Sequence, residues 1–333
     1  MGAELILAGD IGGTKTNLAL FAADAPPGAP LTVASFRSAD HPSLSAIITQ
    51  FLAREKALVR RAAFGVAGPV AAGKATATNL HWRIDRDQLC ATHSFQQVVL
   101  VNDLVATATA VPLLGPADLH PIRPGLPEPG GPIAVIAPGT GLGEAFLLWD
   151  GQHYRAHASE GGHADFAPDT PQEMRLLAFL QPELGHVSYE AICSGLGIPN
   201  LYRFLKQEGA AEPDWLRTRL AAAADPTPVI MDTALNQTES APICQDTLRL
   251  FVKILGAEAG NLALKIMATG GVYLAGGIPP RILTALETGL PAPFTNKGRL
   301  SHVLQKIPVQ VIVNPDAPLL GAATLARQME TTP

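Results

Sequence analysis

The amino-acid sequence predicts an α/β protein in which parallel strands alternate with helices and the chain is divided into two lobes. Short apolar runs that indicate strands alternate with segments of helical spacing, which is typical of parallel sheets covered by helices. The chain has 333 residues, whereas a single hydrophobic core stops growing at roughly 250–300 residues. A unit of strand, glycine loop and strand also occurs once in each half, which indicates an internal duplication.

The N-terminal half begins with two apolar runs, Leu5–Ala8 and Thr16–Phe21, separated by glycines. Such a pair predicts a β-hairpin. Further apolar runs predict strands, and apolar residues at helical spacing or an aspartate at a helix start predict helices. In chain order these are a strand at Val33–Phe36, a helix over Ser43–Ala53, a strand at Ala62–Ala67, a helix over Asp85–Cys90, a buried strand at Val98–Val101 and a helix from Leu104.

The second half follows a stretch rich in proline and glycine, Gly115–Pro132, a composition typical of a domain boundary. We expect a small domain of residues 1–113 and 314–333 and a large domain of residues 114–313. The alanine-rich segment Ala210–Asn236 predicts a surface insertion. The predicted elements are strands at Ile133–Ile136, Glu144–Trp149, Val272–Ala275 and Val309–Val313, and helices within Gln172–Phe204, over Asp246–Ala268, from Pro279 and over Leu319–Met329.

Composition and charge exclude several classes of protein. The net charge of −5 comes without a basic stripe, so nucleic acid is not expected as a ligand. No uncharged run reaches the roughly 20 apolar residues of a membrane span, and Glu4 and Asp10 stand where an export signal would be basic and then apolar. The three cysteines are far apart, which fits neither a disulfide framework nor a zinc knuckle. A cytoplasmic globular protein is therefore expected.

The segment Gly9-Asp10-Ile11-Gly12-Gly13-Thr14 has the residues of a phosphate-binding turn. Glycines let backbone N–H groups approach a phosphate, and Thr14 adds a hydroxyl donor. Asp10 can hold Mg²⁺ through water, because Mg²⁺ keeps several of its waters in protein sites. The segment is neither a Walker loop nor a dinucleotide fingerprint, and a plain hairpin turn is the alternative.

A second glycine loop, Gly139-Thr140-Gly141-Leu142-Gly143, follows the first strand of the second half. Two such loops from a duplicated unit can grip a phosphate chain from opposite sides. Gly270-Gly271 and Gly276-Gly277 flank another strand and could form a surface of small residues for a flat purine. The alternative for these two pairs is close packing of a helix against a strand.

Asn102-Asp103 ends a buried strand and precedes a helix. Ligands of parallel α/β sheets collect beyond the carboxyl ends of the strands, so Asp103 is placed as a catalytic carboxylate would be. The alternative is that Asp103 only caps the helix.

Glu160-Gly161-Gly162-His163 places a carboxylate and an imidazole on either side of two glycines, and Glu190 follows near the start of a helical pattern. Carboxylates, Asn and His provide the fixed acceptors and donors that sugar hydroxyls need. A zinc site is a poor alternative, because zinc takes three or four close ligands and no cysteine is nearby. Cys193 has no obvious base beside it and is expected to be buried.

These segments occur in the order seen in bacterial ATP-dependent glucokinases, which the chain resembles over nearly its whole length. The most specific stretches are EGGHADFAP from Glu160, LGHVSYEAICSGLGIPNLYR from Leu184 and NPDAPLLGAA from Asn314. That family belongs to the actin-like, hexokinase-type ATPase superfamily with a ribonuclease H-like fold. The resemblance implies two lobes with duplicated mixed sheets flanked by helices, and a central cleft that closes over MgATP and glucose.

The resemblance also implies a role for each matching residue and a homodimeric enzyme. The implied roles are a general base for Asp103, glucose contacts for Asn102, Asp103, Glu160, His163 and Glu190, phosphate loops at Gly9–Thr14 and Gly139–Gly143, a water-mediated Mg²⁺ contact for Asp10, and adenosine contacts for Gly276 and Gly277. Lys15-Thr16-Asn17 replaces the Asn-Ala-Arg of many glucokinases and resembles the repressor/ORF/kinase sugar kinases. The cysteine-rich zinc motif usual in those kinases does not follow His163.

Two alternatives to glucose phosphorylation remain open from the sequence. The first is a kinase for another hexose, such as fructose or mannose. The second is a non-catalytic sugar sensor, for which a transcriptional version would carry a helix-turn-helix before the loop that begins at Gly9. A chaperone-like or filament-forming actin relative would lack the pattern of Glu160, His163 and Glu190.

Overall fold

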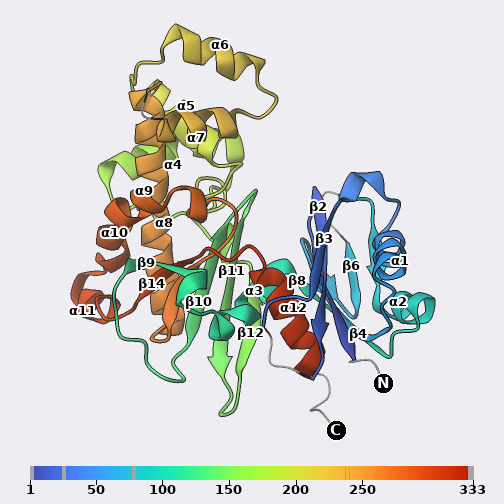
Figure 1. Ribbon diagram of the computed structural model, residues 1–333. Helices are drawn as coiled ribbons and strands as arrows, with labels where there is room; N and C mark the ends of the chain where they lie inside the picture. The colour runs from blue at the N-terminus through green and yellow to red at the C-terminus, as the bar shows by residue number, and fades with distance from the viewer. Residues whose placement is uncertain (1–3, 25–27, 77–79, 237, 240, 329–333) are drawn as a thin grey trace. The chain divides into compact units, whose positions relative to one another are not determined.

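Figure 1 presents the computed structural model of the chain, which describes residues 4–24, 28–76, 80–236, 238–239 and 241–328. The chain divides into two compact units. Unit 1 comprises the chain up to Leu119, Leu147–Ala158 and the chain from Asn314, and unit 2 comprises His120–Phe146 and Ser159–Val313. These units differ from the expected domains in residues 114–119 and 147–158, which belong to unit 1.

Unit 1 contains a five-stranded sheet in the order β3-β2-β1-β4-β8. The apolar runs formed the expected hairpin, because β1 pairs with β2 in antiparallel fashion across the glycine turn. β3 adds a further antiparallel strand, and β4 and β8 extend the other side in parallel. The strands are β1 (Leu5–Ile11), β2 (Lys15–Ala22), β3 (Thr32–Arg37), β4 (Val59–Val66) and β8 (Gln97–Asn102).

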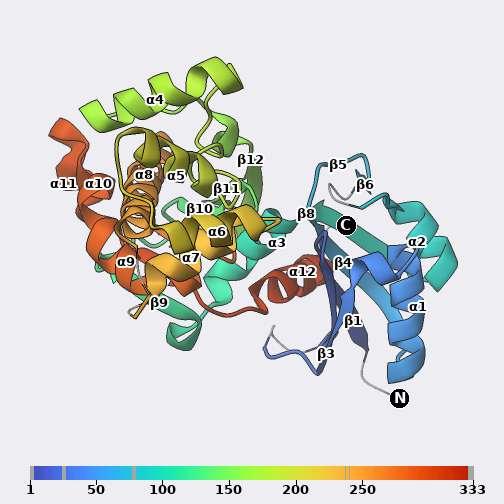
Figure 2. The same ribbon diagram turned by 90° about the horizontal axis from the view of Figure 1, so that it is seen from above.

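Helices cover both faces of this sheet, as Figure 2 shows. α1 and α2 pack on one face through Ile47, Phe51 and Leu89, and α3 and α12 pack on the other and against each other. The closing helix begins two residues earlier than expected, and Met329 lies outside the described residues. The helices are α1 (Leu44–Glu55), α2 (Arg86–His93), α3 (Asp103–Ala110) and α12 (Ala317–Gln328).

A small antiparallel sheet, β5-β6-β7, was not predicted from the sequence. Its strands are only two or three residues long, which is too short for an alternating pattern to stand out. Gly73 forms its turn with a φ of +74°. The strands are β5 (Val70–Ala71), β6 (Lys74–Thr76) and β7 (Arg83–Asp85).

The six-stranded sheet that contains β10 repeats the strand order of unit 1 and adds β9 at one edge. Its order is β12-β11-β10-β13-β14-β9, so β10 takes the place of β1, with β11 and β12 on one side and β13 and β14 in parallel on the other. The predicted duplication is therefore confirmed as a shared topology. The strands are β9 (Leu119–Arg123), β10 (Ile133–Pro138), β11 (Leu142–Trp149), β12 (Tyr154–Ser159), β13 (Gly271–Leu274) and β14 (Val309–Ile312).

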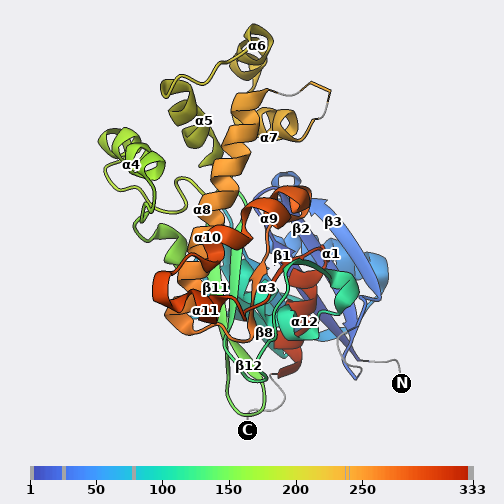
Figure 3. The ribbon, with the colours of Figure 1, turned by 90° about the vertical axis from the view of Figure 1, so that its left-hand side faces the viewer.

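The helices of unit 2 gather around one long buried helix, α8, against which α5 and α7 pack (Figure 3). The expectation of a surface insertion at Ala210–Asn236 is wrong in part. The segment forms α6 and α7, and Leu216, Ile230 and Met231 join the core of unit 2. The helices are α4 (Pro171–Leu184), α5 (Ile198–Gln207), α6 (Asp214–Ala222), α7 (Pro226–Leu235), α8 (Pro242–Ile266), α9 (Leu283–Gly289), α10 (Pro291–Thr295) and α11 (Ser301–Leu304).

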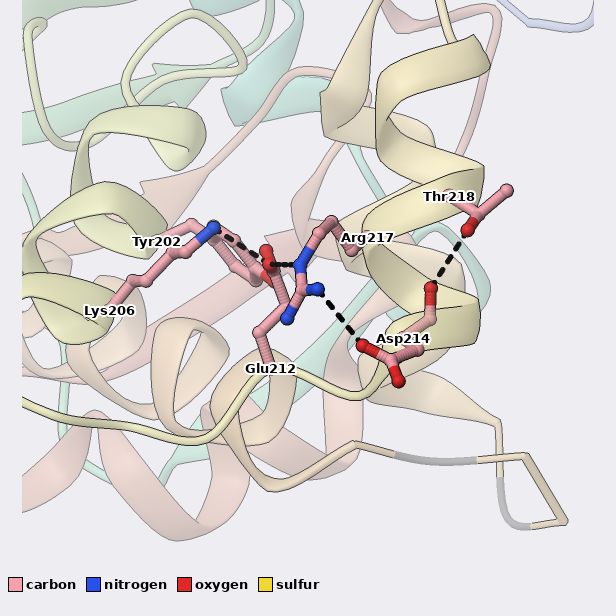
Figure 4. Close-up of polar contacts among 6 residues, drawn as sticks. All are labelled: Tyr202, Lys206, Glu212, Asp214, Arg217 and Thr218. Carbon is pink, nitrogen blue, oxygen red and sulfur yellow. Dashed lines mark hydrogen bonds and ion pairs between the residues drawn. The ribbon is translucent and has the colours of Figure 1, made fainter.

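A carboxylate, Glu212, ties the start of α6 to α5 (Figure 4). Its side chain is 5% exposed and accepts hydrogen bonds from the Tyr202 hydroxyl at 2.9 Å, Lys206 Nζ at 2.7 Å and Arg217 Nε at 3.0 Å. Burial alone would raise the pKa of Glu212, but the hydrogen bonds from Lys206, Tyr202 and Arg217 outweigh it and lower the pKa. The resulting stabilisation is present at neutral pH and lost as the pH falls through the folded-state pKa.

Glu212→Gln should lower the free energy of unfolding by about 1 kcal/mol at pH 7, because an amide accepts weaker hydrogen bonds than a carboxylate does. Urea unfolding measures the change. Glu239→Gln is the control, since the exposed Arg219–Glu239 pair at 3.5 Å should contribute less than about 0.5 kcal/mol. The Glu212 effect should shrink below about pH 4, and an equal effect at pH 7 and pH 3 would contradict the assignment.

Candidate active site

The turn between β1 and β2 is held in shape by Ser38. Ser38 Oγ donates to the carbonyl oxygen of Gly12 at 2.9 Å, and the Ser38 N–H donates to the carbonyl oxygen of Thr14 at 3.0 Å. The turn residues Gly12, Gly13 and Thr14 are partly or fully exposed. The Gly12 N–H is already used, because it donates to the Lys15 carbonyl oxygen at 2.9 Å. The accessible groups that remain for a phosphate are therefore those of Gly13 and Thr14.

Gly9 and Ile11 of the same motif lie within strand β1. A Cβ atom at Gly9 would overlap the Phe64 ring, and the Ile11 side chain is fully buried in the core. The glycine at position 9 therefore serves strand packing. Any contact of these two residues with a nucleotide would have to use their backbone groups.

Two carboxylates of unit 1, Asp10 and Asp103, lie close enough to interact. Burial, and then the charge of Asp103, raises the pKa of Asp10 to about 6, although a hydrogen bond from Asn17 opposes the shift. Asn17 Nδ2 donates to Asp10 Oδ2 at 3.3 Å. Neighbouring carboxylates that repel each other suit a divalent cation, and carboxylate oxygens are among the donors that Mg²⁺ prefers.

Asn102 caps helix α3, so Asp103 is the first residue of the helix and not its cap. The Asn102 side chain accepts from the Leu104 N–H at 3.0 Å and donates to the Gly68 carbonyl oxygen at 3.4 Å. Asp103 Oδ1 also accepts from the Leu104 N–H, at 2.9 Å. The alternative that Asp103 serves as the cap is therefore wrong, and Asn102 has a structural role that sequence reasoning missed.

Asp103 is held beside β4 by Gly65, a residue that sequence reasoning did not single out. A Cβ atom at Gly65 would come within 2.9 Å of Ala106 Cβ and 3.3 Å of Asp103 Cα. Burial raises the pKa of Asp103, while hydrogen bonds from backbone N–H groups lower it in part. A partly exposed carboxylate with a raised pKa at the carboxyl end of a parallel strand is suited to accept a proton.

In unit 2, the loop between β10 and β11 is fixed by backbone hydrogen bonds. The Gly195 N–H donates to the Gly139 carbonyl oxygen at 2.8 Å, and the Leu196 N–H donates to the Thr140 carbonyl oxygen at 3.2 Å. A Cβ atom at Gly141 would overlap Glu190 Oε2. Glycine is thus required at position 141, because a side chain there would overlap Glu190, a candidate sugar contact.

Glu190 and His163 lie side by side in unit 2. His163 Nδ1 is 3.9 Å from Glu190 Oε1, and Glu190 Oε2 accepts from the Leu142 N–H at 2.9 Å. The Glu190 N–H donates to the Gly162 carbonyl oxygen at 2.8 Å. Glu190 lies in an irregular turn, and the next helix begins only at Ile198, so the expected helix start near Glu190 is wrong.

Glu160 lies at the same turn as His163, because the His163 N–H donates to the Glu160 carbonyl oxygen at 3.0 Å. Cβ atoms at Gly161 and Gly162 would overlap Glu144 Oε2 and the Leu142 carbonyl oxygen, respectively. Only glycines therefore let this turn lie directly against β11. The turn presents Glu160 and His163, both exposed, beside Glu190.

The two remaining glycine pairs have different roles. Gly276 has a φ of +84° and packs against the Pro138 carbonyl oxygen, whereas the space beside Gly277 is open. Gly270 and Gly271 stand at the opposite end of β13, where a Cβ atom at Gly270 would overlap the Gly131 carbonyl oxygen. The predicted purine surface is thus reduced to Gly276-Gly277, whereas Gly270-Gly271 serves close packing.

A small, largely apolar pocket lies next to Gly277 along the chain. The pocket is lined by Ile198, Thr227, Pro228, Met231, Ile278 and Arg281. Most of these residues come from α7 or from the segment after Gly277. Sequence reasoning missed this pocket, because it treated Ala210–Asn236 as a surface insertion.

Three further properties of the described residues concern metal clusters, a cysteine and membrane spans. Within that part of the chain, no group of three or more His, Cys, Asp and Glu could hold a metal ion. Cys193 is fully buried, as expected. None of the described helices is both long and apolar enough to cross a membrane.

Comparison with known proteins gives one consistent result. A family model described as Glucokinase matches residues 7–329. The chain is 39% identical to a glucokinase of Nostoc punctiforme, covering 98% of this chain and 99% of that protein, and 37% identical to one of Synechocystis, covering 97% and 98%.

Solved structures extend this similarity to the fold. The structure of a glucokinase from an Antarctic psychrotroph matches with a TM-score of 0.83 and 33% identity, covering 98% of this chain and all of that one (100%). A ROK family glucokinase of Streptomyces griseus in complex with glucose and AMPPNP matches with a TM-score of 0.64 and 22% identity, covering 97% and 99%. The latter similarity concerns the fold alone.

Proposed function

Because the chain belongs to the glucokinase family and is thus an ATP-dependent sugar kinase, we propose that it transfers the γ-phosphoryl group of ATP to the 6-hydroxyl of glucose. The observation that carries this proposal is the grouping of Glu160, His163 and Glu190 on one surface of unit 2. These side chains offer the fixed acceptors and donors that bind sugar hydroxyls. The products are glucose 6-phosphate and ADP.

Asp103 is proposed as the general base of the transfer. As the oxygen of the 6-hydroxyl attacks the γ-phosphorus in line, the hydroxyl proton moves to the Asp103 carboxylate and the bond to the β-phosphate oxygen breaks. The raised pKa of Asp103 brings the carboxylate nearer to the working pH, which favours proton transfer. Bound Mg²⁺, held by Asp10 through water, would supply charge neutralisation at the β- and γ-phosphates.

The nucleotide is proposed to bind through the two glycine loops. Gly13 and Thr14 are partly or fully exposed in the turn of unit 1 and would offer backbone and hydroxyl donors, with Gly12 shaping the turn through its bonds to Lys15 and Ser38. Gly139–Gly141 forms the equivalent loop in unit 2. The pocket that includes Met231 and Ile278 is apolar enough for an adenine ring, with Gly276 and Gly277 near the ribose.

Further proposals concern a glucose contact, the cofactor, the assembly and the location of the protein. Asn102 would contact glucose through Nδ2, since its hydrogen bond to the Gly68 carbonyl oxygen is long at 3.4 Å. The family resemblance supports Mg²⁺ as the cofactor and a homodimer that acts in the cytoplasm, at the entry to glycolysis. No nucleic acid or membrane partner is proposed.

A sugar panel tests the proposed substrate. ADP formation with glucose should exceed that with fructose, mannose or N-acetylglucosamine by at least about tenfold in kcat/KM, because a site that hydrogen-bonds one hydroxyl pattern penalises its analogues. The four sugars are compared side by side in a coupled assay. A higher kcat/KM for fructose or mannose than for glucose would identify that sugar as the substrate instead. Sugar binding without ADP formation would favour a non-catalytic sensor.

A further inference from the structure

A pair of buried carboxyl groups lies behind the turn that carries Glu160 and His163. Glu144 of β11 is 2% exposed and Glu258 of α8 is fully buried. The two groups interact directly, through their charges and a side-chain hydrogen bond. Neither residue takes part in the phosphoryl transfer proposed above.

Glu144 is in direct contact with the sugar turn. Its Oε2 atom occupies the place that a side chain at Gly161 would fill, so the backbone between Glu160 and His163 rests on this carboxyl group. The Gly161 N–H donates to Ser159 Oγ at 3.0 Å. The position of the turn is therefore set by its hydrogen bond to Ser159 and by its contact with Glu144.

Glu258 connects the pair to the segment that carries Glu190. Asn261 Nδ2 donates to Glu258 Oε2 at 2.9 Å and to the Tyr189 hydroxyl at 2.9 Å. The Tyr189 N–H in turn donates to the carbonyl oxygen of Ala164 at 3.1 Å, just after the sugar turn. The buried cluster thus supports both segments that present the sugar candidates.

We propose that Glu144 is a positioning residue, which holds the Glu160–His163 turn in its glucose-binding position only while its carboxyl group is neutral. This inference rests on the proposed function, because it concerns the same sugar site. A neutral carboxyl group can donate its proton to the Glu258 carboxylate. Two ionised groups in the same place would repel each other and displace Glu144 from Gly161.

The electrostatics of the cluster agree with one shared proton. Burial, and then the charge of Glu258, raises the pKa of Glu144 to about 7, while Lys265 opposes the shift. Glu144 Oε1 is buried without a hydrogen-bond partner among the described residues, as expected of a group that is not fully solvated as an anion. The other titratable groups of this cluster are Lys265, Tyr189, Cys193, Glu173 and Lys297.

The sign of the pH dependence follows from the raised pKa. Glu144 is neutral below about pH 7 and becomes ionised above it. Glucose affinity should therefore fall as the pH rises, and the glucose KM of the wild type should be about tenfold higher at pH 8 than at pH 6. The Tyr189 and Cys193 side chains stay neutral over this range, because burial raises the pKa of both groups.

Two variants of Glu144 separate positioning from simple packing. Glu144→Gln keeps the shape and is neutral at every pH, so its glucose KM at pH 8 should remain close to its value at pH 6. Glu144→Ala removes the support and should raise the glucose KM by roughly tenfold, with kcat and the KM for ATP within about twofold of wild type. Any pH dependence that does not arise from Glu144 is common to all three proteins, and comparing them removes it.

Steady-state kinetics and calorimetric glucose binding at pH 6, 7 and 8 provide the measurements, and thermal melting confirms that each variant is folded. Rescue by glutamine, together with loss of the pH dependence, supports the inference. A Glu144→Gln enzyme with the wild-type pH profile, or a Glu144→Ala enzyme with unchanged glucose KM, would overturn it while leaving the function intact. A wild-type protein that neither binds nor phosphorylates glucose would overturn both.

Discussion

The Asp103→Asn enzyme should turn over glucose roughly 10²–10⁴-fold more slowly than the wild type, which is the usual contribution of a general base. An amide cannot accept the hydroxyl proton as oxygen attacks phosphorus. The substitution keeps the shape of the side chain, and its oxygen can still accept from the Leu104 N–H, as Asp103 Oδ1 does at 2.9 Å. The coupled assay measures kcat, and calorimetry should show that glucose still binds.

Asp87→Asn is the matched control for this substitution. Asp87 is an exposed carboxylate in the first turn of α2, where it pairs with Arg86 at 3.0 Å. Its replacement changes the charge of unit 1 by the same amount at another helix start, and kcat should stay within about twofold because a surface pair contributes little. An Asp103→Asn enzyme whose kcat is within a few fold of wild type would refute the assignment of the general base.

Among substitutions of glycine by alanine in unit 1, Gly321→Ala should be the most destabilising. The free energy of unfolding should fall by about 3 kcal/mol. The added Cβ atom would overlap the Ala106 carbonyl oxygen and come within 3.1 Å of the Ala110 backbone nitrogen. Both obstacles are backbone atoms of α3, so the helices can relieve the overlap only by moving apart. Urea unfolding measures the loss, and hydrogen exchange at the α3 amides should locate it.

Thr324→Ala is the control in the same helix. The Thr324 hydroxyl donates within α12, to the Leu320 carbonyl oxygen at 2.8 Å, and the side chain is only partly buried. Its removal should change the stability by no more than about 0.5 kcal/mol. If Gly321→Ala proved as stable as Thr324→Ala, the close contact of α3 with α12 would not be a constraint on this protein.

Much of the fold could be predicted because local patterns specify it. The glycines after Leu5–Ala8 and Ile133–Ile136 break apolar runs, and the two runs became β1 and β10, which hold corresponding places in sheets of equivalent order. Asp103 could be selected as a candidate because ligands of parallel α/β sheets collect beyond the carboxyl ends of the strands, although the same position also suits a helix cap. In these cases, the decisive information lies within a few consecutive residues.

The features that escaped prediction depend on contacts between distant segments. Glu144 has the sequence context of an ordinary strand residue, and only the fold places it under Gly161 and beside Glu258. The apolar residues of α7 gave no strong periodic signal, and their burial follows from packing on α8. The capping role of Asn102 was likewise hidden, because either residue of the Asn102-Asp103 pair could have capped α3.

The hydrogen bond from the Leu142 N–H to Glu190 Oε2, 2.9 Å long, has a consequence for the order in which ligands act. Leu142 is the first residue of β11, directly after the loop proposed for the phosphates, and Glu190 belongs to the surface proposed for the sugar. A sugar that orients this carboxylate also steadies the loop, so occupancy of either place should strengthen the other by the same factor. Reciprocal cooperativity between the two substrates is thus the expected consequence of one backbone hydrogen bond.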